Sequence, residues 1–160
     1  MNTIPFRPMR PGVTLSGIDQ AADIVGWLWQ PKYDDERAVI TPDGRVWTRF
    51  GKPFSPRKLP PNLTKHPGEA LDVLLIGFRT GEKPRRWLIV DRPDRPGPYW
   101  QRMLNLPAAM VPPGRSTAKE AWELARSIPG TEGIVGRRVL APYCQGDSSD
   151  MVKIKWRKNI

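Results

Sequence analysis

The chain has 160 residues, of which 39% are hydrophobic and 19 are proline, and its net charge is +10. This length suits one domain that can bury a core, and so many prolines exclude long helical bundles. No apolar run is long enough to span a membrane as a helix. The excess of lysine and arginine predicts a polyanionic partner, nucleic acid before membrane.

The first half of the chain is predicted to be mostly extended. Residues 1–18, rich in proline, arginine and glycine, are expected to form a basic arm, and residues 19–160 the folded domain. Residues 27–33 resemble a strand, and 36–50 a hairpin that turns at Asp43 and Gly44. Residues 50–68 are expected to be a loop. Further strands are expected at 69–78 and 85–91, joined by a second hairpin connection over 79–84.

The second half contains the clearest helical signals. Residues 96–106 predict a short helix, and residues 116–128 a longer one in which Thr117 and Glu120 have the spacing of a capping box. Strands are predicted at 132–140 and 150–158. The order of elements predicts an α+β fold, with mostly antiparallel sheets and flanking helices.

The last predicted strand alternates apolar residues with lysines. Val152 and Ile154 would cover one face, and Lys153 and Lys155 the other, since side chains alternate along a strand. Neighbouring like charges are destabilising unless an anion lies between them. Lysines also protect exposed edge strands, and for this strand alone an edge position is the favoured explanation.

Residues 27–34 place a lysine among other polar groups. The same period of two puts Gln30, Lys32 and Asp34 on one face, with Trp27, Trp29 and Tyr33 covering the other. Lys32 near other cations would have a lowered pKa and become nucleophilic. Carboxylates nearby, Glu132 among them, can hold a divalent metal. This combination suits a lysine that attacks the α-phosphate of a nucleotide, whereas a P-loop and a Cys/His metal site are excluded by composition.

Five short segments then resemble a known family. The segment "KYDDER" resembles the nucleophile motif Lys-x-Asp-Gly-x-Arg of covalent nucleotidyltransferases, and "TRFGKPF" their Arg-x-Gly element. The segment "RRWLIVDRPD" resembles their third motif, and "EGIVGRR" and "MVKIKW" their fourth and fifth. The motifs occur in family order across residues 27–158, and the tail is most similar to ATP-dependent DNA ligases.

The resemblance implies the ligase-type nucleotidyltransferase (ATP-grasp-like) fold and lysyl-AMP chemistry with ATP and Mg²⁺ or Mn²⁺. It implies that Lys32 is the nucleophile, and that Lys153 and Lys155 hold the α-phosphate. The remaining implied residues are Arg37 and Arg49 for ribose, phosphate or the nicked strand, Gln30 and Asp91 for the nucleotide, Glu69 for the ribose, and Glu132 and Asp34 for the metal.

Three positions depart from the family pattern. Asp35 stands where the motif has glycine, and Val90 where an aromatic residue stacks on adenine. The ribose-binding glutamate is expected to be Glu69, and the alternative register puts Leu74 there. The resemblance ends at the fifth motif, so the OB-fold domain that follows it in these ligases is expected to be absent, its place open to a partner protein.

These observations favour a minimal polynucleotide ligase that seals nicks in duplex DNA, located in the cytoplasm of a bacterial cell or phage-infected host. The single cysteine, Cys144, fits a reducing compartment. Three alternatives stay open: a catalytically degenerate ligase-like protein that binds nucleic acid, an RNA ligase, and a structural or assembly protein.

Overall fold

The computed structural model describes residues 5–21, 25–55, 59, 63, 68–78 and 86–156. Residues 1–4 of the expected arm, the hairpin connection at 79–84, much of the loop at 50–68, and residues 157–158 of the last expected strand lie outside these ranges. Within the described residues, no helix is both long and apolar enough to cross a membrane. The strands are β1 (Met9–Thr14), β2 (Trp27–Tyr33), β3 (Glu36–Ile40), β4 (Val46–Thr48), β5 (Leu71–Ile76), β6 (Arg86–Asp91), β7 (Thr131–Arg138) and β8 (Gly146–Lys155).

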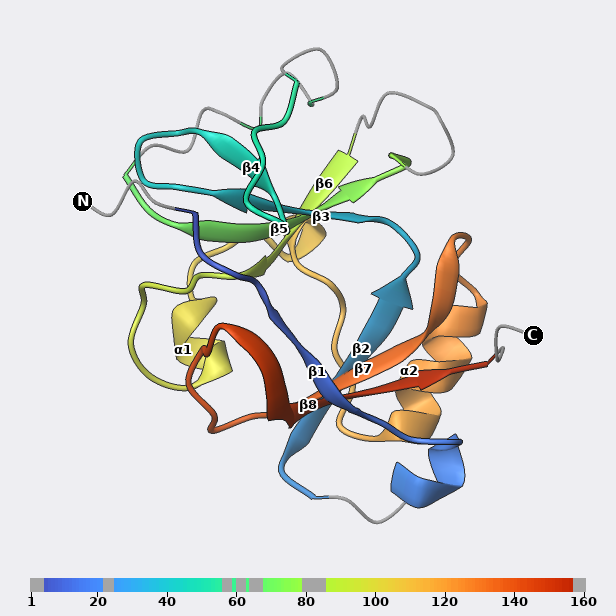
Figure 1. Ribbon diagram of the computed structural model, residues 1–160. Coiled ribbons are helices and arrows are strands. Elements are labelled where there is room, and N and C mark those ends of the chain that lie inside the picture. Colours follow the sequence, from blue (N-terminus) through green and yellow to red (C-terminus); the bar gives the residue numbers. More distant parts are fainter. Residues whose placement is uncertain are drawn as a thin grey trace.

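The strands form two four-stranded sheets. One has the order β1-β8-β7-β2 and the other β4-β3-β5-β6, and the chain passes from the first to the second directly between β2 and β3 (Figure 1). The helical elements outside the sheets include α1 (Tyr99–Arg102), α2 (Ala118–Arg126) and the 3₁₀ turns η1 (Ile18–Ala21) and η4 (Ala108–Met110). The predicted α+β class is therefore confirmed, although the first sheet is mixed because β1 runs parallel to β8.

Two local predictions are confirmed in detail. The β3–β4 hairpin turns at Gly44, which has a φ of 84°, and the backbone N–H of Thr41 donates to the carbonyl of Arg45 at 3.0 Å. Helix α2 begins after Thr117, whose Oγ1 accepts a hydrogen bond from the backbone N–H of Glu120 at 3.2 Å. This bond satisfies one of the amides that the start of a helix leaves unpaired.

Strand β1 was not predicted, and it changes the interpretation of β8. Met9 pairs with Gly146 and Thr14 with Lys153, so β8 lies between β1 and β7. The edge-strand explanation for its lysines is therefore wrong. The segment Met9–Thr14 contains a proline and a glycine and lacks apolar alternation, so strand periodicity did not reveal it.

The first sheet has one apolar face and one polar face. Trp29, Ile134, Val152 and Ile154 lie in a buried cluster with the alanines of α2, which packs against β2 and β7. The register places Gln30 opposite Val135, and Val135 opposite Lys153, on the other face. The predicted alternation of β8 is confirmed, and the polar face of this sheet turns away from α2.

Candidate active site

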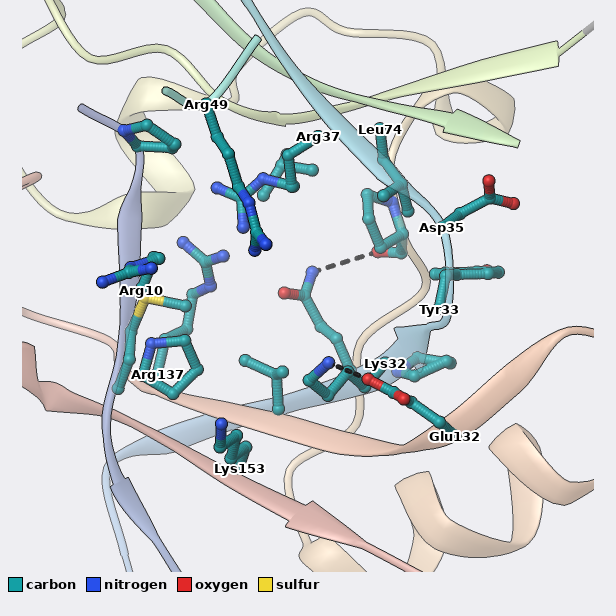
Figure 2. A pocket seen from close by; sticks show the side chains of 18 of the residues that line it. Arg10, Lys32, Tyr33, Asp35, Arg37, Arg49, Leu74, Glu132, Arg137 and Lys153 are labelled. Carbon is teal, nitrogen blue, oxygen red and sulfur yellow. Dashed lines mark hydrogen bonds and ion pairs between the residues drawn. The ribbon is translucent and has the colours of Figure 1, made fainter. Parts of the chain in front are cut away.

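A pocket of about 420 Å³ opens between the two sheets, in the size range of small-molecule sites (Figure 2). Strands β2, β7 and β8 line it on one side, and β3, β5 and β6 on the other. Among the site residues expected from sequence, six line it: Gln30, Lys32, Arg37, Arg49, Glu132 and Lys153. The pocket therefore brings together most of the residues that the motifs singled out.

The nucleophile candidate belongs to an ion-pair cluster with Glu132 at its centre. Lys32 Nζ donates a hydrogen bond to Glu132 Oε1, and Lys155 Nζ lies 3.5 Å from Glu132 Oε2. Lys32 pairs with Gly133, and Tyr33 with Thr131, so Glu132 is the extra residue of a bulge in β7. Without the bulge Glu132 would point to the opposite face, because Gly133 already shares the face of Lys32.

Gly133 allows β7 to carry this carboxylate next to β8. Its φ is 152°, and a Cβ atom at this position would lie 1.9 Å from the carbonyl oxygen of Ile154. Any side chain would force β7 and β8 apart at the point where Glu132 meets the two lysines. The glycine of the Glu-Gly pair is therefore required by close backbone packing.

The surroundings of Lys32 favour its neutral amine. Burial lowers its pKa from the ordinary value, the hydrogen bond and charge of Glu132 oppose that shift, and the charges of Lys155 and Lys153 add to it. The net direction is downward, and burial is the largest cause. Glu132 is the carboxylate that acts against it.

Asp34 is misplaced in the sequence prediction because β2 ends at Tyr33, so the alternation of the strand does not extend to Asp34. Tyr33 itself lines the pocket beside Lys32, next to the register shift. Asp34 is exposed, does not line the pocket, and donates its backbone N–H to Gly130. The structure does not bring Asp34 to Glu132 as a shared metal site.

Gln30 is fixed at the base of the pocket. It is 4% exposed, and its amide nitrogen donates to the hydroxyl of Tyr99 and to the carbonyl of Pro112, both at 3.2 Å. Because these two bonds use both N–H groups, the amide oxygen remains as the acceptor that Gln30 can offer to a ligand.

Glu69 lies elsewhere, contrary to expectation. Its carboxylate pairs with Arg95 at 3.0 Å and with Arg92 at 3.3 Å. The strand that borders the pocket is β5, on which Leu74 is the lining residue, and Glu69 precedes the first residue of that strand. The structure therefore favours the alternative register, which places an apolar side chain where the family has a ribose-binding glutamate.

Asp91 is buried within the protein and does not line the pocket. Arg102 donates Nε to Asp91 Oδ1 at 2.8 Å and Nη2 to Oδ2 at 3.0 Å, and Arg137 Nη1 donates to Oδ2 at 3.0 Å. The carboxylate side chain is 1% exposed. Asp91 therefore neutralises two arginines, and its neighbour Val90 is the residue of β6 that reaches the pocket.

Arg37 reaches the pocket but is held by a second buried carboxylate. Its Nε lies 2.9 Å from Asp72 Oδ1 and its Nη2 2.5 Å from Oδ2, and the hydroxyl of Tyr143 donates to Asp72 at 2.8 Å. Burial raises the pKa of the Asp72 carboxyl, while Arg37 and Tyr143 oppose that shift. Nη2 also donates to the carbonyl of Met9, so Arg37 links the two sheets.

Two further cations line the pocket and were missed. Arg10 comes from β1, which was expected to be part of the arm, and Arg137 from β7. Arg137 lies two residues after Val135 and so shares its face, a signal that strand periodicity offered. The cations lining the pocket in the described part of the chain are Arg10, Lys32, Arg37, Arg49, Arg137 and Lys153. Such a set suits phosphate groups.

The acids of the pocket fit a metal ion only in part. Among the described residues there is no group of three or more aspartate, glutamate, histidine or cysteine side chains that could hold one. Glu132, Asp35 and Asp147 line the pocket, and Asp147 is paired with Arg10 at 2.9 Å. Magnesium is often held by one or two carboxylates together with substrate phosphates and water, and Glu132 fits that arrangement.

Comparison with known proteins identifies the fold. No protein-family model and no curated protein sequence matches the chain. A structure of a Lig E DNA ligase aligns with a TM-score of 0.60 at 19% identity, covering 91% of this chain and 69% of the ligase. Mycobacterial DNA ligase D complexed with ATP and MES aligns with a TM-score of 0.66 at 18% identity, covering 94% of this chain and 60% of the ligase. Chlorella virus DNA ligase-adenylate aligns with a TM-score of 0.67 at 17% identity, covering 94% of this chain and 67% of the ligase.

The chain therefore has the nucleotidyltransferase fold of ATP-dependent DNA ligases, as the motif resemblance implied. It spans about 60% of the ligase D structure and about two thirds of the other two. At these identities the likeness establishes the fold, and the pocket geometry must carry any argument about activity.

Proposed function

We propose that this protein is a minimal polynucleotide ligase that seals nicks in DNA through a lysyl-AMP intermediate on Lys32. The observation that carries the proposal is the placement of Lys32, with a lowered pKa, against Glu132 in a pocket lined by cations. The ligase fold supports it. Neither a purely structural nor an assembly role requires a partly buried amine in a pocket lined by several positive charges.

In the first step, the neutral amine of Lys32 attacks the α-phosphorus of ATP. A nitrogen–phosphorus bond forms, the bond to the β-phosphate oxygen breaks, and pyrophosphate leaves. The ammonium of Lys32 must first lose a proton, and Glu132 is the carboxylate in contact with it. Lys153 and Lys155, on the same face of the sheet, are placed to neutralise charge that develops on the α-phosphate.

In the second step, an oxygen of a nucleic-acid 5′-phosphate attacks the same phosphorus, and Lys32 leaves as the amine. The product is a strand capped with AMP through a new phosphoanhydride bond. In the third step, a neighbouring 3′-hydroxyl attacks the 5′-phosphorus, a phosphodiester bond forms, and AMP is released. Arg37 and Arg49, which border the pocket opposite Lys32, would orient these phosphates (Figure 2).

Nucleotide and metal binding follow from the remaining residues. The amide oxygen of Gln30 would accept a hydrogen bond from the base, and Val90 and Leu74 would give it apolar contacts. Glu132 would hold Mg²⁺ or Mn²⁺, which when bound would supply charge neutralisation on the phosphates. Residues outside the pocket, Glu69 and Asp34, take no part in this proposal. A partner protein in place of an OB-fold, and a cytoplasmic location, remain part of the proposal.

A second candidate function is nucleic-acid binding without catalysis. Leu74 and Val90 favour it, because they offer a nucleotide neither a ribose-binding carboxylate nor an aromatic ring to stack on the base. Weak nucleotide binding would leave the basic pocket as a phosphate-binding surface.

The deciding experiment is incubation of the purified protein with ATP labelled at the α-phosphate and Mg²⁺ or Mn²⁺. We expect one covalent AMP per chain, labile in acid and stable in base, as a phosphoramidate is. Lys32→Ala should lose it because the amine is removed. Lys32→Arg should also lose it, because guanidinium remains protonated and cannot act as the nucleophile. Lys119→Ala, an exposed lysine on α2, is the matched control and should retain it. Absence of an adduct with ATP, GTP and NAD⁺ would leave the non-catalytic function as the better account.

Nick sealing is tested separately, by joining a labelled 5′-phosphate to a 3′-hydroxyl in nicked duplex DNA and in the matching RNA-containing duplex. We expect DNA to be joined. Faster joining of the RNA would assign the same pocket to RNA ligation instead.

A further inference from the structure

A second hollow adjoins the pocket of Lys32. It has a volume of about 500 Å³ and shares Pro8, Arg10, Arg49 and Asp147 with the pocket. The N-terminal segment 5–8 forms one of its walls, and residues 49–51, which follow β4, form another. We call this second hollow the side groove. Because four residues belong to both, the groove and the pocket lie side by side.

An exposed aromatic ring lies on the wall of the side groove. Phe50 is 71% exposed, and the guanidinium carbon of Arg49 lies 4.6 Å from the centre of its ring. The tight turn that carries it is fixed by two bonds to Thr48: the N–H of Phe50 donates to Oγ1 at 3.3 Å, and the N–H of Gly51 to the carbonyl at 2.9 Å. The ring is therefore presented to solvent by an ordered backbone, with a cation beside it.

The groove has more positive than negative charge. Arg7, Arg10 and Arg49 line it, and Asp147 is its acidic residue within the described part of the chain. Asp147 is paired with Arg10, and no carboxylate of the described residues is within ion-pair distance of Arg7 or Arg49. The backbone N–H of Arg7 donates to the side chain of Gln145 at 2.9 Å, which holds this segment against the domain.

A basic channel with an exposed aromatic ring has the chemistry that recognises single-stranded nucleic acid. Arginines contact successive phosphates, and a base stacks on the ring whatever its sequence. Bases of an intact duplex are already stacked on one another and cannot use Phe50. A nucleotide triphosphate would use the arginines but would gain nothing from a ring outside the pocket.

We propose that the side groove binds an unpaired nucleic-acid strand, with a base stacked on Phe50 and its phosphates on Arg7 and Arg10. The strand would lead its 5′-phosphate toward Lys32, and only this last statement rests on the function proposed above. The groove would therefore add affinity for an end with unpaired nucleotides, such as an overhang, beyond the affinity of the pocket for a fully paired nick.

The test is binding of a fluorescein-labelled, 5′-phosphorylated single-stranded DNA, measured by anisotropy across a series of salt concentrations. Phe50→Ala should raise the Kd about tenfold with an unchanged salt slope, because it removes stacking and no charge. Arg7→Ala should reduce the slope of log K against log salt by about 0.7, the value for one phosphate contact on a single strand. Phe50→Trp should keep or strengthen binding, whereas Phe50→Leu should weaken it.

Matched controls lie on other surfaces. Trp100→Ala removes an aromatic side chain that is 57% exposed on α1, and Arg126→Ala removes an exposed cation from α2. Both should leave the Kd and the salt slope as in the unaltered protein. Equal effects of Phe50→Ala and Trp100→Ala would overturn the proposal.

The same variants separate this inference from the proposed function. Neither Phe50 nor Arg7 lines the pocket, so both alanine variants should form lysyl-AMP normally. If no variant forms lysyl-AMP but Phe50→Ala still weakens DNA binding, the proposed function fails and the groove proposal holds. If the variants instead raise the KM for ATP and leave DNA binding unchanged, the groove binds the triphosphate of ATP, and the proposal is overturned.

Discussion

Glu132 and Asp91 each hold two cationic side chains, yet water reaches the two clusters very differently. Around Glu132, the side chains of Lys32, Lys155 and the glutamate itself are 22–32% exposed. Around Asp91, the side chains of Arg102, Arg137 and the aspartate are 1–5% exposed. The same ratio of one acid to two bases therefore occurs in a partly hydrated and in a dry setting.

The chemistry of the cations differs in the same direction. Arginine stays protonated, so the Asp91 cluster is a permanent connection between β6, α1 and β7. Lysine can lose its proton where burial lowers its pKa, so the Glu132 cluster can become reactive. The comparison assigns the Asp91 cluster to the fold around the pocket, and in the proposed function the Glu132 cluster takes part in the chemistry.

The largest effect should come from breaking the dry cluster. Asp91→Ala would leave two buried arginines without their carboxylate, and we expect the free energy of unfolding to fall by about 3–5 kcal/mol. Denaturant titration measures this loss. Asp150→Ala removes the partner of Arg138 from an exposed pair, with side chains 37% and 53% exposed, and should cost only about 0–1 kcal/mol. Similar losses in the two variants would contradict the distinction.

Breaking the hydrated cluster should affect chemistry far more than stability. Glu132→Gln should change the free energy of unfolding by no more than about 1 kcal/mol, because the pairs are partly exposed. The rate of lysyl-AMP formation should fall about a hundredfold, the loss typical of one electrostatic group at a reacting phosphate. Single-turnover kinetics with labelled ATP gives the rate. If Glu132→Gln instead lowered the free energy of unfolding strongly, while its folded fraction formed lysyl-AMP at the normal rate, the roles of the two clusters would be reversed.

The pH dependence of lysyl-AMP formation sharpens the comparison further. The amine attacks only when neutral, so the rate should rise with pH and level off below the ordinary lysine pKa of 10.5, because the pKa of Lys32 is lowered. The charge of Lys155 contributes to that lowering, so Lys155→Ala should move the half-maximal rate to higher pH. Rate–pH profiles of both proteins test this, and a shift to lower pH would contradict the assigned sign.

The smallest effect is expected for the lysines of β8 when only stability is measured. The double variant Lys153→Ala and Lys155→Ala should leave the melting temperature nearly unchanged or slightly raised, since it removes like charges that share one face. Val152→Asp, on the opposite face in the α2 core, should unfold the protein. Thermal scans of the three proteins check the alternation of this strand.

Local signals in the sequence predicted much of the fold. The cap at Thr117, the turn at Gly44 and the alternation of β8 depend on residues close together in the chain, and all three are confirmed. The parallel pairing of β1 with β8 joins segments more than 130 residues apart, and nothing within Met9–Thr14 indicates a strand.

The site was predictable where it follows strand periodicity or the motifs. Alternation predicted that Gln30 and Lys32 share a face of their strand and that Lys153 lies on the polar face of another, and the register through β7 brings these faces together. The bulge that turns Glu132 toward Lys32 was not predicted, although Gly133 beside it is a glycine within a strand, a residue that often marks a bulge. Asp91 shows the other limit, since its partners Arg102 and Arg137 come from α1 and β7 and no spacing rule connects them.

The pairing of β1 with β8 also bears on how the protein is made. Arg10 on β1 and Lys153 on β8 both line the pocket, although more than 130 residues separate them in the chain. Ribosomes add about 5–20 residues per second, so β1 waits several seconds after its synthesis before its neighbour β8 exists. During translation the nascent chain has an unpaired β1, and the pocket is complete only after β8 has left the ribosome.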